Sequence, residues 1–320
     1  TAYEIRPRDW SSDVCSSDLR ARDNLLALRA RDIAVQLGGA VGTLSVMGDK
    51  GAAIRARVAT TLGLADPGLV WHTLRDPILH CAGALAESCG AAAKIARDVQ
   101  LLMQTEVAEV AEESSDDRGG SSAMPHKHNP VDSLVPVACA QVSAGLLASF
   151  AHGMVGVEER SPGEWHGEWI ALPILTQLAH AAARAIRLTV TGLTVDANAM
   201  AENLEKLRGL MAAEALSAAL FPSLGKAEAQ KLVRDLSARV VKEKTHLKKL
   251  AAADARIQKS LNAAALDAIF AHRDALKAAE ATAHLPVLAF STPRHADLQT
   301  AALAAGATII ASRSEEHTSE

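Results

Sequence analysis

The chain has 320 residues, of which 49% are hydrophobic, and its 33 lysine and arginine residues against 37 acidic residues leave a formal net charge of −4. This length has room for about two domains, and the hydrophobic fraction excludes a disordered chain. The near-neutral charge excludes the strongly basic surface typical of nucleic-acid-binding proteins. Only 3% of the residues are aromatic while alanine is frequent, which favours helix over sheet. An uninterrupted apolar run of the length that spans a membrane is absent, so a membrane protein is not expected.

The two ends of the sequence differ from everything between them. Residues 1–19 contain the single tyrosine, and both this segment and residues 313–320 read, when back-translated, like the adapter of a short-read sequencing library. The two ends even share a reverse-complementary core. We therefore interpret residues 1–19 and 313–320 as sequencing artefact and exclude them from the expected fold.

The elements from residue 20 to residue 194 are predicted to be mainly long helices. Residues 20–46 read as the end of a helix that runs into a glycine turn, and a short helix is predicted over residues 52–62. Residues 78–113 contain no proline and place apolar side chains at steps of three and four, which predicts one helix of roughly 50 Å. Two further long helices are predicted over residues 132–155 and 168–194. Helices of this length are typical of an elongated, alanine-rich bundle.

The glycine turn superficially resembles a dinucleotide-binding loop. Its glycines are Gly38, Gly39 and Gly42, but no strand precedes them and the third glycine of the fingerprint is missing. A nucleotide-binding site is therefore not expected there.

The pattern changes twice toward the C-terminus. We predict a partial helical bundle over residues 20–192 and a domain of shorter helices over residues 193–283. Residues 284–312 instead read as strand, helix and strand, a small α/β-like tail that is either an extension of the protein or foreign sequence. The predicted fold class is thus all-α, a long-helix bundle with a smaller helical C-terminal domain.

A polar segment between two of the long helices carries the residue types needed for chemistry on carboxylic acids. Residues 119–130 read GGSSAMPHKHNP, with glycines at one end and Pro130 at the other. A lysine and an asparagine supply donors for an oxyanion, and a serine in a closed loop can transfer a proton. By composition alone, however, a solvated linker looks similar.

As a pattern, residues 120–130 match without a gap the signature Gly-Ser-Ser-x-Met-Pro-x-Lys-x-Asn-Pro, and the chain therefore resembles the fumarase/aspartase superfamily. The resemblance implies a long-helix bundle in which three subunits of a homotetramer build each active site. It implies that Ser121 transfers the proton and that Lys127 and Asn129 bind a substrate carboxylate. Other loop residues expected to contact substrate are Ser122, Met124 and His126.

One departure from the superfamily pattern narrows the choice of branch. Lyases of this superfamily usually carry a glutamate seven residues after the lysine, where it charges a histidine of another subunit, but this chain has Leu134. A leucine cannot polarise an imidazole, which argues against adenylosuccinate lyase, argininosuccinate lyase and fumarase.

Residues 159–169, ERSPGEWHGEW, resemble instead the corresponding stretch of bacterial 3-carboxy-cis,cis-muconate cycloisomerases, as do residues 71–76. On this resemblance Arg160, Trp165 and His166 are expected to contact substrate. Two alternatives stay open, since Trp165 and Trp169 are spaced as one helix face in a core and Arg160 could form a structural ion pair.

The branch implies conversion of 3-carboxy-cis,cis-muconate to 4-carboxymuconolactone in protocatechuate degradation by the β-ketoadipate pathway. One carboxylate adds to a double bond and a carbon next to another carboxyl group is protonated. No cofactor is implied, and no metal either, because His126 and His128 have no third ligand at a suitable spacing. The alternatives are an adenylosuccinate lyase-like β-elimination and a non-catalytic bundle scaffold.

Three expectations concern the chain as a whole. Outside the adapter-like ends the cysteines are Cys81, Cys89 and Cys139, an odd and scattered set typical of reduced thiols in a cytoplasm. We expect a small polycarboxylate as substrate and neither nucleic acid nor membrane as partner. Relatives carry an N-terminal domain and two earlier active-site segments that are not found here, so we expect the 320-residue chain to be inactive by itself.

Overall fold

A computed structural model describes residues 20–28, 32–113, 119–120, 124, 127–158, 161–271, 288–290 and 309–311. The artefact segments predicted at residues 1–19 and 313–320 lie outside these ranges. The chain divides into two compact units, each taken by itself below. The long-helix unit comprises the described residues up to Gln104 together with Val110–Thr194, and the C-terminal unit comprises Thr105–Glu109 and the residues from Val195 onward.

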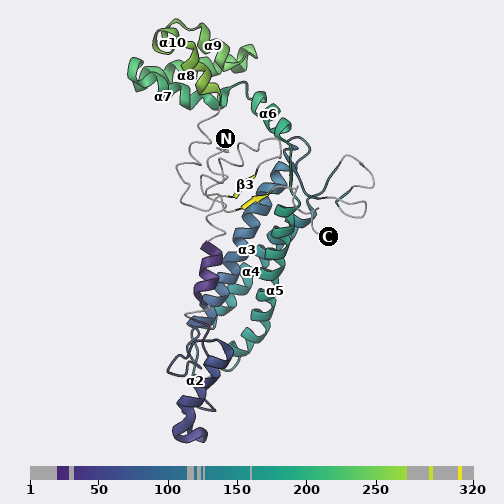
Figure 1. Ribbon diagram of the computed structural model, residues 1–320, viewed down its shortest axis with the longest axis vertical. Helices are drawn as coiled ribbons and strands as arrows, with labels where there is room; N and C mark the ends of the chain where they lie inside the picture. The colour runs from purple at the N-terminus through teal and green to yellow at the C-terminus, as the bar shows by residue number, and fades with distance from the viewer. Residues whose placement is uncertain are drawn as a thin grey trace, which may run out of the picture. The chain divides into compact units, whose positions relative to one another are not determined.

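Three long helices form the body of the long-helix unit and lie side by side (Figure 1). They are α3 (Asp76–Leu102), α4 (Val131–His152) and α5 (Glu164–Thr191). Gln100 near the end of α3 donates a hydrogen bond to the carbonyl of Ser133 at the start of α4, so these two helices are antiparallel. Arg75 just before α3 pairs with Glu168 in the second turn of α5, so α3 and α5 run in the same direction.

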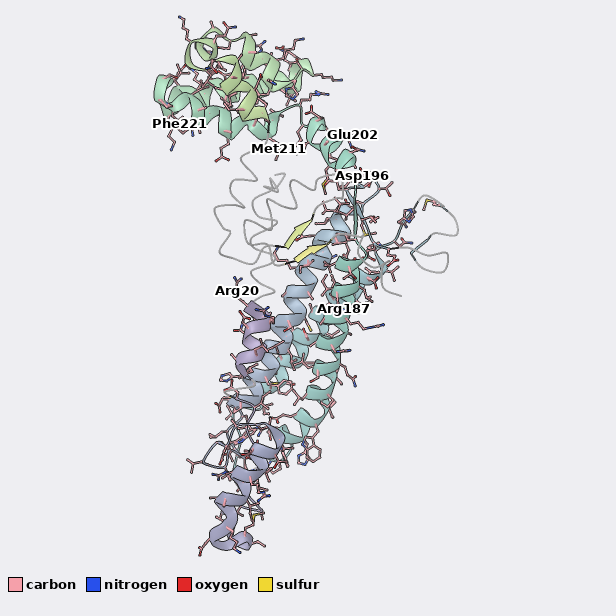
Figure 2. All side chains as sticks on the ribbon, in the orientation of Figure 1. Arg20, Arg187, Asp196, Glu202, Met211 and Phe221 are labelled. Carbon is pink, nitrogen blue, oxygen red and sulfur yellow. The ribbon has the colours of Figure 1, made fainter. Side chains whose placement is uncertain are left out.

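Small side chains allow these helices to approach closely. Ala82, Ala96 and Ala182 are completely buried, and a layer of alanine and cysteine lies between the three helices. A second layer surrounds the fully buried Leu175 of α5 and includes Phe150 of α4. Polar side chains such as Arg187 of α5 lie on the outer faces (Figure 2). The prediction of an all-α, alanine-rich bundle is confirmed.

Helix α3 is shorter than predicted. The sequence predicts a helix to residue 113, but α3 ends at Leu102 and spans about 40 Å. Ala108 takes a left-handed backbone conformation with φ of 51°, and Val110–Ala111 form a short strand, β1, that pairs with β2 (Thr194–Val195). The apolar periodicity continued past the helix because strand β1 also buries a valine, Val110.

The other helices of this unit lie close to their predicted ranges. Residues 20–28 are helical, and a 3-10 helix, η1 (Ser45–Lys50), leads into α2 (Gly51–Leu62). Helix α5 begins four residues before its predicted start, because Gly163 with φ of 109° turns the chain and the backbone N–H of Gly163 donates to Nδ1 of His166.

The C-terminal unit consists of short helices around one apolar core. Its elements are α6 (Ala197–Lys206), the 3-10 helix η2 (Leu210–Ala212), α7 (Ala213–Leu224), α8 (Lys226–Glu243), α9 (Leu247–Ala253), α10 (Ala255–Ser260) and α11 (Ala263–Phe270). Leu216, Leu232 and Leu247 are among its completely or almost completely buried residues. Asp196, His246 and Asp254 each cap the helix that follows by accepting backbone N–H groups.

Two strands lie in the predicted tail. Strands β3 (Leu288–Phe290) and β4 (Ile309–Ala311) pair in parallel, with Leu288 opposite Ile309. The two strands match the prediction, and the helix predicted between them lies outside the described residues.

Helix α4 has the length and the apolar composition of a membrane span, although the sequence shows no unbroken apolar run of that length. Within the described residues it is the one helix with these properties. It packs against both α3 and α5, and its buried residues include Pro136, Cys139 and Phe150, so it is one of the three core helices of this unit.

Candidate functional site

The predicted carboxylate-binding loop enters α4. Its described residues are Gly119, Gly120, Met124 and the run from Lys127 to Pro130, whereas Ser121, Ser122 and His126 lie outside the described residues. The backbone N–H of Asn129 donates to the carbonyl of Gly119 at 2.7 Å, which brings the two arms of the loop together. The N–H of Lys127 donates to the carbonyl of Met124 at 2.9 Å.

The side chains of this loop are open to solvent. Lys127 and Met124 are exposed and Asn129 is half-buried, so the lysine and the amide that the sequence assigns to carboxylate binding can be reached by a small molecule. His128 is exposed as well. Leu134, which stands where related lyases carry a glutamate, is 54% exposed on the first turns of α4.

A buried carboxylate that sequence reasoning missed lies at the base of this loop. Glu112 is 7% exposed, and its two carboxylate oxygens accept the backbone N–H groups of Asp132 and Ser133 at 2.8 and 2.9 Å. A carboxylate at the N-terminus of a helix is favoured by the unpaired N–H groups and by the helix dipole. Glu112 therefore joins the start of the loop to the first turn of α4.

A second group of candidate residues lies around the start of α5. A cleft of about 260 Å³ is lined by Gln36, Trp71, His72, Arg75 and Trp165. A smaller adjoining hollow is lined in part by Gly156 and Ser161 of the connection between α4 and α5. Trp165, one of the residues expected to contact substrate, thus forms part of a concave surface.

A buried ion pair supports this cleft. The guanidinium of Arg75 makes two hydrogen bonds to the carboxylate of Glu168, one of them from Nε to Oε1 at 2.8 Å. Both side chains are about 10% exposed, and the guanidinium also lies over the ring of Trp71 at 6.0 Å. Because Arg75 precedes α3 and Glu168 belongs to α5, the pair fixes the spacing of the two cleft walls.

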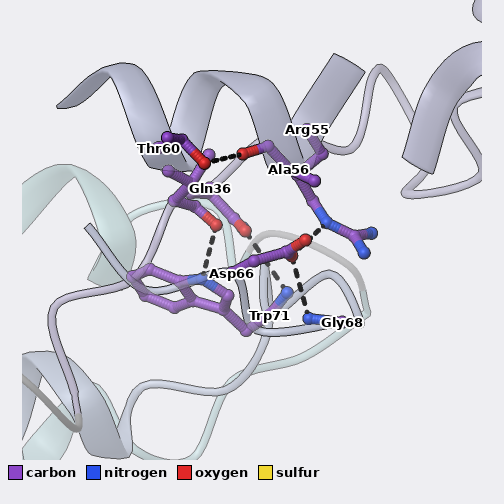
Figure 3. A network of polar contacts seen from close by, with 8 residues as sticks. Gln36, Arg55, Ala56, Thr60, Asp66, Gly68 and Trp71 are labelled. Atoms are coloured by element: carbon purple, nitrogen blue, oxygen red, sulfur yellow. Dashed lines mark hydrogen bonds and ion pairs between the residues drawn. The ribbon is translucent and has the colours of Figure 1, made fainter. Parts of the chain in front are cut away.

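Hydrogen bonds hold Trp71 in place (Figure 3), and a contact with the side chain of Gln36 holds His72. The indole N–H of Trp71 donates to the carbonyl of Val35 at 3.2 Å, and its backbone N–H donates to Oε1 of Gln36 at 3.3 Å. Because Oε1 of Gln36 accepts this hydrogen bond, the other amide atom, Nε2, is the one that faces Nδ1 of His72, at 2.5 Å. Since an amide nitrogen can only donate, Nδ1 accepts and a neutral His72 carries its proton on Nε2.

The Nε2 of His72 is buried and has no hydrogen-bond partner among the described residues. It faces the glycine turn, where a methyl group on Gly38 would come within 2.8 Å of it. The turn therefore requires glycine at this position. An unsatisfied buried donor is unfavourable by about 1–3 kcal/mol.

An exposed carboxylate completes the same network (Figure 3). Asp66 accepts a hydrogen bond from Nε of Arg55 at 2.6 Å and another from the backbone N–H of Gly68 at 3.1 Å. The hydrogen bond from Arg55, followed by that from Gly68, lowers the pKa of Asp66 below its ordinary value. Arg55 itself is buried, so the pair fastens α2 to the segment that leads to Trp71.

The aromatic residues of α5 contact one another edge-on or tilted at its surface rather than in the core. The rings of Trp165 and Trp169 are 5.1 Å apart, and His166 lies 4.7 Å from Trp169. Trp169 is 59% exposed and Trp165 is half-buried in the cleft wall. Within one copy of the chain the two tryptophans therefore do not form a core face. Arg160 lies outside the described residues.

The loop and the cleft lie at opposite ends of the three-helix body. The loop leads into the first residue of α4, whereas the cleft residue Trp165 belongs to the first turn of α5, beyond the last residue of α4. Helix α4 has 22 residues and thus separates the two places by about 33 Å. A molecule of the size of a tricarboxylic acid cannot contact both within one copy of the chain.

Three cysteines are described and free, and no cluster of three metal-ligating side chains occurs within the described ranges. Burial raises the pKa of Cys89 and of Cys139 above the ordinary thiol value, as it does for Cys81. These thiols therefore stay protonated at neutral pH.

Comparisons with known proteins agree with this fold and with the loop. Residues 10–144 match the family model described as lyase, and residues 209–284 match that described as adenylosuccinate lyase C-terminus. The chain belongs to the fumarase/aspartase superfamily, so the resemblance carried by the loop is confirmed.

Within the superfamily the similarity is to one branch. The chain is 43% identical, over 81% of its length and 58% of the relative, to the 3-carboxy-cis,cis-muconate cycloisomerase of Bradyrhizobium diazoefficiens. The crystal structure of the 3-carboxy-cis,cis-muconate lactonizing enzyme from Pseudomonas putida superposes with a TM-score of 0.74 at 36% identity, covering 84% of this chain and 61% of that one. The nitrosuccinate lyase of Streptomyces davaonensis is 39% identical over 83% of the chain and 57% of the relative. The chain thus spans a little over half the length of the relatives it matches.

Proposed function

We propose that the chain is part of a cycloisomerase that converts 3-carboxy-cis,cis-muconate to 4-carboxymuconolactone. In this reaction a carboxylate oxygen of the substrate forms a bond to a carbon of a conjugated double bond. The electron pair of that bond moves toward a neighbouring carboxyl group, and the carbon beside this group takes up a proton. The observation that carries the proposal is the loop that presents Lys127 and Asn129 at the start of α4, in a chain similar to enzymes of this name.

The loop supplies the charge chemistry of the proposed reaction. Negative charge develops on a carboxyl group during the addition, and Lys127 and Asn129 are donors that stabilise it. Ser121 transfers the proton, while Ser122, Met124 and His126 contact the substrate. None of these steps requires a metal or a redox cofactor. Because Leu134 removes the carboxylate that activates a histidine in related lyases, proton transfer rests on the loop itself.

The cleft at the start of α5 supplies the surface for the conjugated part of the substrate. Trp165 and Trp71 offer aromatic faces to a planar diene. By the resemblance to the cycloisomerase branch, Arg160 and His166 are assigned to contacts with its outer carboxylates. The presence of two tryptophans on the wall of one cleft supports the assignment.

Loop and cleft serve one site only if different copies of the chain supply them. The separation of about 33 Å along α4 supports this arrangement, as do the exposed apolar side chains of the long-helix unit. These include Leu134, Val155 and Ile170, which are 54, 83 and 68% exposed. We infer a homotetramer with shared active sites, acting in the cytoplasm, where free thiols such as Cys89 persist.

Two alternatives to this function are a β-elimination lyase and a scaffold without catalytic activity. The superfamily includes β-elimination lyases, and both the nitrosuccinate lyase and the match to an adenylosuccinate lyase C-terminus concern such enzymes. Running the proposed addition backwards is itself a β-elimination, so the same donors serve either reaction. A scaffold without activity would have no use for the exposed lysine and amide of the loop.

The test is turnover of 3-carboxy-cis,cis-muconate, followed by its ultraviolet absorbance, with the product of the complete gene. Lys127→Ala removes the cation that faces the developing charge, and we expect kcat/KM to fall about 100- to 1000-fold. Ser121→Ala should reduce kcat to a similar degree.

The matched control is Lys231→Ala, which removes an exposed lysine from α8 in the C-terminal unit and should leave turnover unchanged. Unchanged turnover in Lys127→Ala would remove the assigned role. Turnover of nitrosuccinate or adenylosuccinate in place of the muconate would replace the proposed reaction with an elimination.

A further inference from the structure

Helix α4 lacks an ordinary N-terminal cap. Its capping position is Pro130, whose side chain has no acceptor atom and therefore cannot accept a hydrogen bond from the backbone N–H groups of the first turn. The N–H groups of a first helical turn have no partners within the helix and need one from elsewhere. For α4 the partner comes from Glu112, twenty residues before Asp132 in the sequence.

The geometry at Glu112 is that of a clamp across the base of the loop. One carboxylate oxygen accepts the N–H of Asp132 at 2.8 Å and the other accepts the N–H of Ser133 at 2.9 Å. Glu112 follows strand β1 directly, so its backbone is anchored by the pairing of β1 with β2. Gln100 of α3 holds the same turn of α4 through the carbonyl of Ser133 at 2.8 Å.

A second closure lies inside the first. The hydrogen bond from the N–H of Asn129 to the carbonyl of Gly119 joins the two arms of the loop, three residues before Asp132. Two sets of hydrogen bonds thus close the loop: the outer set joins Glu112 to residues 132–133, and the inner one joins Gly119 to Asn129. Lys127 lies two residues inside the inner closure, so its position depends on both.

We propose that Glu112 is a positioning residue that fixes Lys127 and Asn129 relative to α4. The effect on catalysis rests on the proposed function, whereas the effect on the loop backbone does not. Because the carboxylate already occupies the anion-binding end of α4, that end is closed to a substrate carboxylate. Binding of substrate charge is thereby left to the side chains of Lys127 and Asn129.

The test compares Glu112→Ala with the unaltered 320-residue chain by amide hydrogen exchange. Loss of two hydrogen bonds to a charged acceptor should raise exchange about tenfold or more at Asp132 and Ser133. If Glu112 positions the loop, exchange at Lys127 and Asn129 rises as well. Exchange that rises at Asp132 and Ser133 alone would reduce Glu112 to a helix cap and overturn the proposal.

Kinetics of the complete gene product give an independent reading. We expect Glu112→Ala to lower kcat about tenfold with a much smaller change in KM, because misplaced donors weaken stabilisation of the developing charge more than binding. Added formate should restore part of the activity by occupying the vacated place at the N-terminus of α4. An unchanged kcat, despite faster exchange at Lys127 and Asn129, would contradict the proposal.

Two further variants keep the test decisive. Glu113→Ala removes the same charge one residue away, from a side chain that is exposed and accepts no hydrogen bond among the described residues, and it should leave both readings unchanged. Should Glu112→Ala fail to fold, Glu112→Gln keeps the shape and one acceptor oxygen, and the same exchange pattern is expected in weaker form. If the unaltered enzyme does not turn over 3-carboxy-cis,cis-muconate, the proposed function fails while the exchange data still decide the role of Glu112.

Discussion

Single charged side chains hold the segment that precedes α3. Arg55 is a buried residue of α2 whose guanidinium donates to Asp66, and the segment that follows Asp66 carries Trp71 and His72 into the cleft. The pair Arg75–Glu168 then fastens the end of this segment to α5. The walls of the cleft therefore depend on two ion pairs rather than on apolar packing alone.

The pair between Arg55 and Asp66 predicts a dependence of stability on pH. Its hydrogen bonds lower the pKa of Asp66 in the folded chain, so the stabilisation is complete above the unfolded pKa near 4 and is lost as the pH falls below it. We expect Asp66→Asn to lower the thermal unfolding midpoint at pH 7 and to differ much less from the unaltered chain at pH 3. Asp49→Asn, a change at an exposed position beside α2, should show no such convergence. Parallel curves for Asp66→Asn and the unaltered chain at all pH values would show that the carboxylate contributes nothing.

The long helices pack closely because the side chains between them are small. The sequence pattern was sufficient to predict α2, α4 and α5 to within a few residues, because apolar residues at helical spacing have few other ways to be buried. The end of α3 could not be predicted, since Val110 continues the apolar spacing although it belongs to a strand. The pairings Arg75–Glu168 and Glu112–Ser133 were also beyond prediction, because they join residues 93 and 21 positions apart and leave no local pattern.

The candidate site shows the same division. The loop residues Lys127 and Asn129 were found because their spacing matches a signature, and Trp165 was found by its resemblance to one branch. Gln36 was missed, since a glutamine before a glycine turn has no distinguishing pattern and acts only through its contacts with Trp71 and His72. Glu112 was missed because an acidic residue in a polar stretch looks like any solvated one.

The close packing of α5 predicts a sharp difference between adjacent alanines. Ala182 is completely buried between the long helices, whereas Ala183 is exposed. We expect Ala182→Leu to lower the free energy of unfolding by about 1–3 kcal/mol because the added atoms force the helices apart. Ala183→Leu makes the same chemical change outside the contact and should alter stability by less than about 0.5 kcal/mol. Urea denaturation measures both, and equal values would mean that α5 does not pack through this face.

The molecule as a whole presents apolar surface that a single copy does not bury. Trp169, Ile170 and Ile174 are exposed along one stretch of α5, and Val135 and Val142 are exposed on α4. Exposed apolar residues gathered on two long helices are typical of surfaces that meet another protein copy. Their presence on the long-helix unit agrees with the proposed assembly through the bundle.

The separation of loop and cleft by the length of α4 has a genetic consequence. If every site takes its loop from one copy and its cleft from another, a chain damaged at Lys127 and a chain damaged at Trp165 each still carry the part that the other lacks. Co-assembly of equal amounts of Lys127→Ala and Trp165→Ala should then restore about a quarter of the sites, although each variant alone is strongly impaired. Two lesions in separate alleles would compensate one another, whereas a doubly mutated chain that is expressed alone would leave no site intact. Failure of the mixed enzyme to exceed either parent, with mixing shown by native mass spectrometry, would place loop and cleft in different functions.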